Sequence, residues 1–309
     1  IEGVRIIDLH KWIDNKLYHF VNIIFRGILA SWIRQQKIKF IFGGECIYFY
    51  KVIPYVGNTV KRIELCHLDT WLGYSIGFID FIDLRIFSTK ALMRKVENQY
   101  RENNLSVEFS NRLIFIENFI DIPEYELHQN EKLQVLFVGR GAPQKRVHLI
   151  AAIAEKMQKA GDSVHFNFVG DVENVIRIAD YPFCTFYGNI KDHDYLNSIY
   201  KKSDVLILTS AYEGLPVVVM QMMAYGKIIV STAVDGIPDY VKHNENGLLI
   251  TAIEEQEIID QGAELLRILI NDKTLIEKFG QKSRVLAQSL FSEEVFRRNY
   301  RSVFEVTLN

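Results

Sequence analysis

The chain has 309 residues, of which 49% are apolar and 24% are charged, and its formal net charge is -2. These proportions are those of an ordinary globular protein, and they exclude a disordered or fibrous chain. A net charge this close to zero provides no strong field to recruit nucleic acid. The length suits two domains of roughly 150 residues each.

Cysteine usage and the first residues indicate a cellular compartment. Cys46, Cys66 and Cys184 are scattered, with no Cys-x-x-Cys pair, so neither a zinc site nor a disulfide framework is expected. No signal peptide is visible, and the sequence opens at Ile1 in what reads as the middle of a domain. We therefore expect a cytoplasmic protein whose natural N-terminus precedes this sequence.

One apolar run, Leu17–Ile33, must be tested as a membrane span. It is short and contains polar residues, so it predicts a helix with a wide buried face rather than a span. Four cations lie within or just after the run, namely Arg26, Arg34, Lys37 and Lys39. They could bring the helix edge to anionic lipid at the inner face of a membrane, although a solvated helix flank is the favoured interpretation.

The first part of the chain alternates predicted strands with helical segments, which indicates βαβ units and a parallel sheet. The strands are predicted at Val4–Ile7, Ile38–Phe42, Val60–Cys66, Asp83–Phe87 and Leu113–Ile116. In such sheets function gathers at the carboxyl ends of the strands. His67, Ser88 and Asn118 lie at such ends, and His67 is the best candidate for a site residue.

Two further segments of this part are interpreted as connections. Gly43-Gly44 follows a predicted strand but lacks a third glycine, so it indicates a tight turn rather than a phosphate loop. The polar stretch 122–132 lacks periodicity and contains a proline, which is typical of a linker.

The second part predicts another parallel sheet with a glycine loop at its edge. Its strands are predicted at Leu133–Val138, Val164–Val169, Cys184–Tyr187, Val205–Leu208, Ile228–Val230 and Leu248–Ile250. The first strand is followed by the loop Gly139–Arg146 and by a helix with apolar spacing from Val147. Backbone N–H groups and a helix N-terminus favour an anion there, and Arg140 and Lys145 add full charges. The loop is predicted to bind phosphate.

The stretch Ser203–Gly226 has the same strand, loop and helix order. Pro216 suits the first turn of the helix, and Gly226 suits its end. Glu213 lies in the loop between strand and helix. Alone this could be an ordinary β–α turn, but beside Gly139–Arg146 it predicts one wall of a binding pocket.

One pair of acidic residues resembles a metal site. Asp192 and Asp194 could hold a divalent cation beside a diphosphate. They also precede a predicted helix, where acidic residues cap and complement the helix start. The capping role is favoured, and no metal is expected.

Four motifs of the second part resemble those of the family 4 (group 1) retaining glycosyltransferases. They read GRGAPQKR, FYGNI, SDVLILTSAYEGLP and DGIPDYVKHNENGLLI, and together they cover roughly residues 130 to 250. The first part resembles the family more faintly, at His67, Phe87–Thr89 and Glu117-Asn118. The resemblance implies the GT-B fold, an α/β architecture of two Rossmann-like, doubly wound parallel-sheet domains facing across a cleft. The expected divisions are residues 1–125 as an acceptor domain truncated at its start, 126–290 as the donor domain and 291–309 as a helix crossing back.

The resemblance also implies roles for individual residues. Arg140 and Lys145 would hold the diphosphate of a nucleotide-sugar donor, Glu213 would bond hydroxyls of the donor sugar, and His67 would face that sugar across the cleft. Further contacts to the donor would come from Gly139, Gly141, Gly188, Asn189, Ile190, Gly214, Leu215, Pro216, Val217 and Gln221. Of these, Gly188 to Ile190 would meet the nucleobase. Gln221 stands where the family has a second glutamate that binds ribose, and an amide can still bond hydroxyls, though without charge.

We expect a retaining, metal-independent transferase that moves a sugar to a glycan or lipid-linked acceptor in surface polysaccharide synthesis, with no cofactor. The resemblance favours front-face attack, with the donor phosphate accepting the proton of the acceptor. Two alternatives stay open: a sugar-nucleotide epimerase of the same fold, and an inactive homologue that acts as a scaffold.

Overall fold

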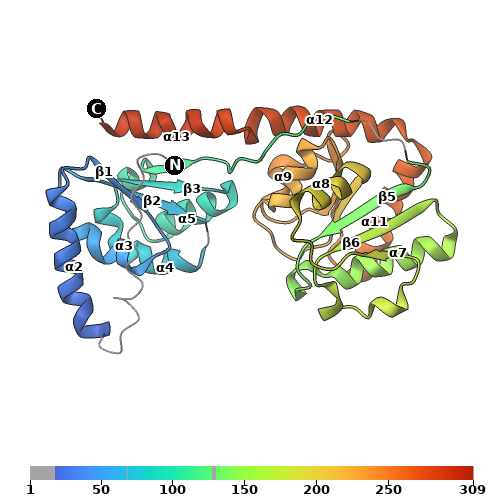
Figure 1. The fold of residues 1–309 in the computed structure, drawn as a ribbon, viewed down its shortest axis with the longest axis horizontal. Coiled ribbons are helices and arrows are strands. Elements are labelled where there is room, and N and C mark those ends of the chain that lie inside the picture. The colour runs from blue at the N-terminus through green and yellow to red at the C-terminus, as the bar shows by residue number, and fades with distance from the viewer. Residues whose placement is uncertain (1–17, 68, 127–129, 309) are drawn as a thin grey trace. The chain divides into compact units, whose positions relative to one another are not determined.

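The computed structural model describes residues 18–67, 69–126 and 130–308 (Figure 1). The chain divides into two compact units. Unit 1 comprises residues 1–88, 92–116 and 302–309, and unit 2 comprises residues 89–91 and 117–301. The predicted strand at Val4–Ile7 lies outside the described residues. The polar stretch 122–132, predicted as a linker, falls within unit 2 rather than at a boundary.

Unit 1 is built on a four-stranded parallel sheet with the order β1-β2-β3-β4. The strands are β1 (Phe40–Gly43), β2 (Lys61–Cys66), β3 (Leu84–Phe87) and β4 (Leu113–Phe115). The helices between and around them are α2 (Tyr18–Gln35), α3 (Ile47–Val52), α4 (Leu72–Ser75), α5 (Lys90–Glu102) and α6 (Val107–Ser110). The predicted strands from Ile38 onward are confirmed to within two residues.

A buried ion pair lies within the sheet of unit 1. Glu64 of β2 and Arg85 of β3 are register partners, and they are 1% and 2% exposed. Arg85 Nε donates to Glu64 Oε2 over 2.5 Å, and its other nitrogens donate to the hydroxyls of Tyr100 and Ser75. Each charge therefore has hydrogen-bond partners, which a buried ion pair needs if it is not to destabilise the fold.

Helix α2 confirms the predicted helix but not its predicted wide buried face. Ile23, Ile24 and Ile28 are 64%, 65% and 58% exposed. Among the side chains of α2 that the structure describes, from Ile23 onward, Ala30 is buried and packs beside Val52 and its neighbours. The apolar spacing specified a helix, but it could not specify how much of its surface would be covered. No helix of the described residues is long and apolar enough to cross a membrane.

Unit 2 is built on a six-stranded parallel sheet with the order β10-β9-β8-β5-β6-β7. The strands are β5 (Leu133–Val138), β6 (Val164–Val169), β7 (Thr185–Phe186), β8 (Val205–Leu208), β9 (Ile228–Thr232) and β10 (Gly247–Ile250). The chain runs from β5 to β6 and β7 on one side, and then returns to β8 on the other side of β5. The order of strands therefore reverses between β5 and β8. In open parallel sheets ligands bind at such a switch point, outside the carboxyl ends of the strands.

Helices cover both faces of this sheet, as in a doubly wound fold. They include α7 (Val147–Ala160), α8 (His193–Lys202), α9 (Val217–Ala224), α10 (Ile237–Tyr240), α11 (Glu255–Asn271) and α12 (Thr274–Phe291). Helix α13 (Glu293–Leu308) follows α12, and its residues from 302 onward belong to unit 1. Helices α7 and α11 pack together, as do α9 and α12, and Figure 1 shows the two pairs on opposite sides of β5 and β6. The predicted apolar face of α7, including Ile150, Ala154 and Met157, is buried. Both Rossmann-like sheets predicted from the sequence are therefore present.

The ion pair of unit 1 gives a stability prediction. An Arg85→Met variant would leave Glu64 as a buried charge without its cationic partner, so we expect unfolding stability to fall by about 3–5 kcal/mol. Urea denaturation followed by circular dichroism would measure the loss. The control is Arg297→Met, which breaks an exposed pair with Glu293 on one helix and should change stability little. Equal effects of the two variants would contradict a structural role for the buried pair.

Candidate functional site

The loops after β5 and β8 are joined to each other by direct hydrogen bonds. Arg146 donates from Nε to the carbonyl oxygen of Thr209 over 2.7 Å, and from Nη2 to that of Ser210 over 3.0 Å. Gln144 Nε2 donates to the carbonyl oxygen of Tyr212, and the backbone carbonyl of Gln144 accepts from the N–H of Ala211. The two loops at the switch point thus form one structure, and the guanidinium of Arg146 is directed at backbone carbonyls.

The glycine loop is also held by the end of β6. Asp171 Oδ1 accepts from the N–H of Gly141 over 2.9 Å, and Asn174 Nδ2 donates to Asp171 Oδ2. The Gly141 N–H is the main reason that the pKa of the Asp171 carboxyl lies below its ordinary value, and the charge of Arg140 adds to it. A Cβ on Gly141 would come within 2.2 Å of the carbonyl oxygen of Asp171. Only glycine allows this approach, so the loop lies directly against the end of β6.

Glu213 lies at the centre of the described site and is 9% exposed. Its Oε1 accepts from Lys145 Nζ in a short contact, and from Ser210 Oγ over 2.7 Å. Asp235, which follows β9, accepts from the backbone N–H of Glu213 over 2.8 Å. Lys145 is 14% exposed, so the pair has limited contact with solvent. The structure therefore brings Lys145, predicted to bind the diphosphate, and Glu213, predicted to bind the sugar, together as an ion pair.

The start of α9 presents backbone N–H groups beside Glu213. Pro216 is the residue before the helix, with φ -61° and ψ 135°, rather than a residue of its first turn. The first N–H of α9 bonded within the helix is that of Val219, to the Pro216 carbonyl. The N–H groups before it have no carbonyl one turn earlier to bind. Gly214 and Val217 are exposed and Leu215 is half-buried, so this backbone is accessible to an anion.

Gln221 lies further along α9 and contacts α8. The hydroxyl of Tyr200 donates to Gln221 Oε1 over 3.2 Å. Burial raises the pKa of Tyr200 to about 12, so the phenol keeps its proton and remains a donor near neutral pH. The amide of Gln221 is thus oriented by a neighbouring helix.

The predicted contacts to the nucleobase belong to the loop after β7, whereas Gly139 directly follows β5 and donates its N–H to the carbonyl oxygen of Val169. Gly188 adopts φ +64°, which favours glycine, and its carbonyl accepts from the N–H of Gly170 over 2.9 Å. Asn189 is exposed and Ile190 is half-buried. The bond between Gly170 and Gly188 ties the loop after β7 to the end of β6, and β6 is the neighbour of β5, which leads into the glycine loop.

His67 belongs to unit 1, whereas the other predicted site residues belong to unit 2. It is exposed and follows β2 directly, and its backbone N–H donates to Glu45 Oε1 over 2.6 Å. Its predicted role opposite the donor sugar stays a prediction.

The structure bears out the capping interpretation of Asp192. Its Oδ1 accepts from the N–H groups of Asp194 and Tyr195 over 2.9 and 3.1 Å, at the start of α8. The carboxylate that could have bound a metal is therefore engaged with the helix.

Four residues that hold these loops were not singled out from the sequence: Ser210, Asp171 and Asp235 of unit 2, and Glu45 beside His67 in unit 1. Each follows a strand of one of the two sheets, and a polar residue in that position is a signal that could have found it. The partners of Asp171, Asp235 and Glu45 could not be read from the sequence, because each of their bonds joins the ends of two different strands. Ser210 bonds Glu213 within one loop.

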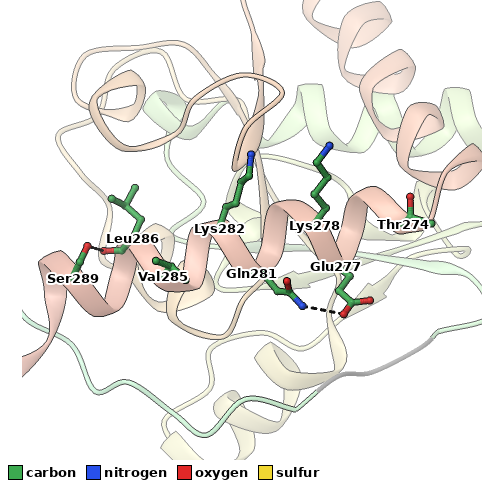
Figure 2. A pocket seen from close by; sticks show the side chains of 8 residues that line it. All are labelled: Thr274, Glu277, Lys278, Gln281, Lys282, Val285, Leu286 and Ser289. Carbon is green, nitrogen blue, oxygen red and sulfur yellow. Dashed lines mark hydrogen bonds between the residues drawn. The ribbon is translucent and has the colours of Figure 1, made fainter.

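A groove of about 750 Å³ along α12 is separate from this site (Figure 2). Its lining runs from Thr274 to Ser289 on that one helix, and no residue of the loops after β5 or β8 contributes to it. Figure 2 shows Lys278 and Lys282 extending in the same direction, and Gln281 bonded to Glu277. Volume alone therefore does not identify the site.

Comparisons with known proteins agree with the motifs. The model of the family described as "Glycosyl transferases group 1" matches residues 118–285. An uncharacterised glycosyltransferase of Methanocaldococcus jannaschii is 28% identical over 128 residues, which cover 40% of this chain and 33% of that protein. The capsular polysaccharide biosynthesis glycosyltransferase CapM of Staphylococcus aureus is 25% identical over 91% of this chain and 74% of its own.

Solved structures show the same fold. The pneumococcal O-GlcNAc transferase GtfA, in complex with UDP and GlcNAc, superimposes with a TM-score of 0.73 at 15% identity, over 92% of this chain and 60% of its own. GtfA and similar GT-B glycosyltransferases confirm the predicted fold class. The chain spans only a third of the archaeal relative and three fifths of GtfA. Because the family match covers more than half of the chain, the chain belongs to the group 1 glycosyl transferases.

Proposed function

We propose that the protein transfers a sugar from a nucleotide-diphosphate donor to a glycan or lipid-linked acceptor, with retention of configuration and without a metal ion. The observation that carries the proposal is the cluster at the switch point between β5 and β8. There Lys145, Glu213 and the N–H groups that begin α9 lie together, with Arg140 on the same glycine loop.

The cations of the loop suit the leaving group. Negative charge builds on the diphosphate as the bond to the anomeric carbon breaks, and fixed cations stabilise that charge more in the transition state than in the ground state. Lys145 has three ammonium protons, and its contact with Glu213 leaves others to direct at a phosphate oxygen. Arg140, on the same loop, is exposed to solvent. This role needs no metal.

Glu213 suits the sugar. Because one of its oxygens already accepts from Lys145 and Ser210, the carboxylate is held in one orientation. A fixed carboxylate of this kind binds sugar hydroxyls as an acceptor. The oxygen of the acceptor hydroxyl would attack the anomeric carbon on the face that the phosphate leaves. Its proton would pass to the departing phosphate oxygen, so the step needs no further base.

The relatives support this reading of the substrates. CapM is named for capsular polysaccharide biosynthesis, and GtfA was solved with UDP and GlcNAc. We assign the nucleobase to Gly188–Ile190 and the ribose to Gln221, whose amide is already oriented by Tyr200. We propose that the reaction forms a glycosidic bond of a surface polysaccharide, on the cytoplasmic side of the membrane.

The cations give the main test of the proposal. Lys145→Ala and Arg140→Ala should each lower kcat by about 100-fold or more, because each removes a charge that stabilises the leaving diphosphate. The measurement is sugar transfer from a UDP-sugar, chosen beforehand by a thermal-shift screen, since a bound donor stabilises the fold. Lys159→Ala is the matched control, because Lys159 lies on the exposed surface of α7, where it pairs with Glu155. Near-normal kcat in both loop variants would reject the assignment.

Products of the wild-type reaction test the stereochemistry and the metal. NMR should show that the new glycosidic bond has the anomeric configuration of the donor, and excess EDTA should leave the rate unchanged. An inverted product or loss of activity in EDTA would contradict the mechanism. Conversion of the donor with no acceptor present would instead indicate the epimerase. A protein that binds no nucleotide diphosphate in calorimetry, with UDP and GDP as probes, would favour the scaffold.

We also place α2 at the membrane surface. Its apolar residues Ile23, Ile24 and Ile28 are exposed, and its basic end carries Arg34, followed by exposed Lys37. An apolar face flanked by cations binds anionic lipid surfaces through both area and charge. A lipid-linked acceptor would then be close to the enzyme.

Vesicle sedimentation tests this contact. The protein should bind phosphatidylglycerol vesicles more strongly than phosphatidylcholine vesicles, and salt should weaken the binding. An Ile24→Glu/Ile28→Glu variant should bind about 10-fold less, since it loses buried apolar area. Ile253→Glu, which changes a still more exposed isoleucine of unit 2, should bind as the wild type does. No preference for the anionic vesicles would contradict the proposal.

A further inference from the structure

The loops after β1 and β2 in unit 1 are in direct contact. A Cβ on Gly44 would come within 2.1 Å of the carbonyl oxygen of Leu65, so the backbone of the first loop lies against the end of β2. The next residue, Glu45, reaches across with its side chain. Its Oε1 accepts from the backbone N–H of His67 over 2.6 Å. The turn at Gly43-Gly44 thus places the carboxylate of Glu45 within hydrogen-bonding distance of His67, which follows β2.

Glu45 is itself held from beneath by Tyr50. The N–H of Glu45 donates to the Tyr50 hydroxyl over 3.4 Å, and that hydroxyl donates to Glu64 Oε1 over 2.6 Å. Glu64 is in turn paired with Arg85. Burial beside Glu64 raises the pKa of Tyr50, so its proton stays in place. A chain of bonds therefore runs from the buried ion pair to the backbone of His67.

The backbone of Glu45 shows that this contact is maintained at a cost. Its φ is +51°, in the left-handed region that glycine adopts readily and that a glutamate occupies only at an energetic cost. The fold would be satisfied by glycine at this position, yet a long acidic side chain stands there and bonds His67. A strained residue of this kind is a reason to look for a function in its side chain.

We propose that Glu45 is a positioning residue for His67, fixing the backbone at the end of β2 and with it the direction of the imidazole. The inference rests on the proposed function and on the predicted role of His67 opposite the donor sugar. A side chain that orients a group at the reacting centre affects the rate of the chemical step, because small misplacements there are costly. It has no direct effect on the nucleotide, whose proposed contacts all belong to unit 2.

Two substitutions at this one position separate orientation from stability. Glu45→Gly removes the carboxylate and also the unfavourable φ, so the protein should be at least as stable to urea as the wild type, while kcat falls by about 10-fold. Glu45→Gln keeps an oxygen that can accept from the His67 N–H, and it should restore kcat to within about 2-fold of the wild type. The affinity for UDP, measured by calorimetry, should be unchanged in both. Glu102→Ala, an exposed glutamate of α5, is the control.

A double variant and an NMR measurement complete the test. Glu45→Gly/His67→Ala should be no slower than His67→Ala, because Glu45 acts only through His67. The amide proton of His67 should move upfield in Glu45→Gly and stay near its place in Glu45→Gln. Wild-type kcat in Glu45→Gly, or additive losses in the double variant, would overturn the inference. Wild-type kcat in His67→Ala would instead remove the proposed role of His67, while the amide shift would still show whether Glu45 holds the loop.

Discussion

The two hydrogen bonds from Arg146 to the carbonyls of Thr209 and Ser210 are the constraint on which the site depends. Parallel strands place their carboxyl ends at one edge, but loops at that edge are free to differ in position. The Arg146 guanidinium removes that freedom by binding the loop after β8 from the start of α7. Lys145 then necessarily lies beside Glu213. The arginine itself occupies the left-handed region, with φ 45°, so some backbone strain accompanies this arrangement.

Much of the fold follows from the sequence, because buried parallel strands are nearly continuous apolar runs. The strands Leu133–Val138, Val164–Val169 and Val205–Leu208 have the predicted bounds for this reason. Short β7, with half-buried residues at the sheet edge, is shorter than predicted. The prediction of a wide buried face for α2 was wrong, because the composition of a helix does not show which of its residues another element covers.

The candidate site could be predicted only in part. The charged residues, such as Lys145 and Glu213, lie in recognisable loops, and their residue types indicate what they can bind. The residues that hold these loops in place cannot be recognised in this way. Asp171, Asp235 and Glu45 each accept from a backbone N–H of another loop, and any acidic residue after a strand would look the same. Their roles depend on which strands are neighbours, which no local pattern encodes.

The ion pair of Arg85 and Glu64 differs from that of Lys145 and Glu213 in a way that separates a structural role from a functional one. In the pair of Arg85 and Glu64 the guanidinium donates hydrogen bonds to Glu64, Tyr100 and Ser75, which are all buried. Its nitrogens are therefore engaged within the fold. The pair of Lys145 and Glu213 joins two loops at a switch point, keeps partial contact with solvent, and lies beside helix N–H groups that have no helical acceptor. A ligand with both phosphates and hydroxyls can bind each member without leaving either charge unpaired. The proposed donor site requires this property, because separating a largely buried ion pair without giving each charge a new partner is strongly destabilising.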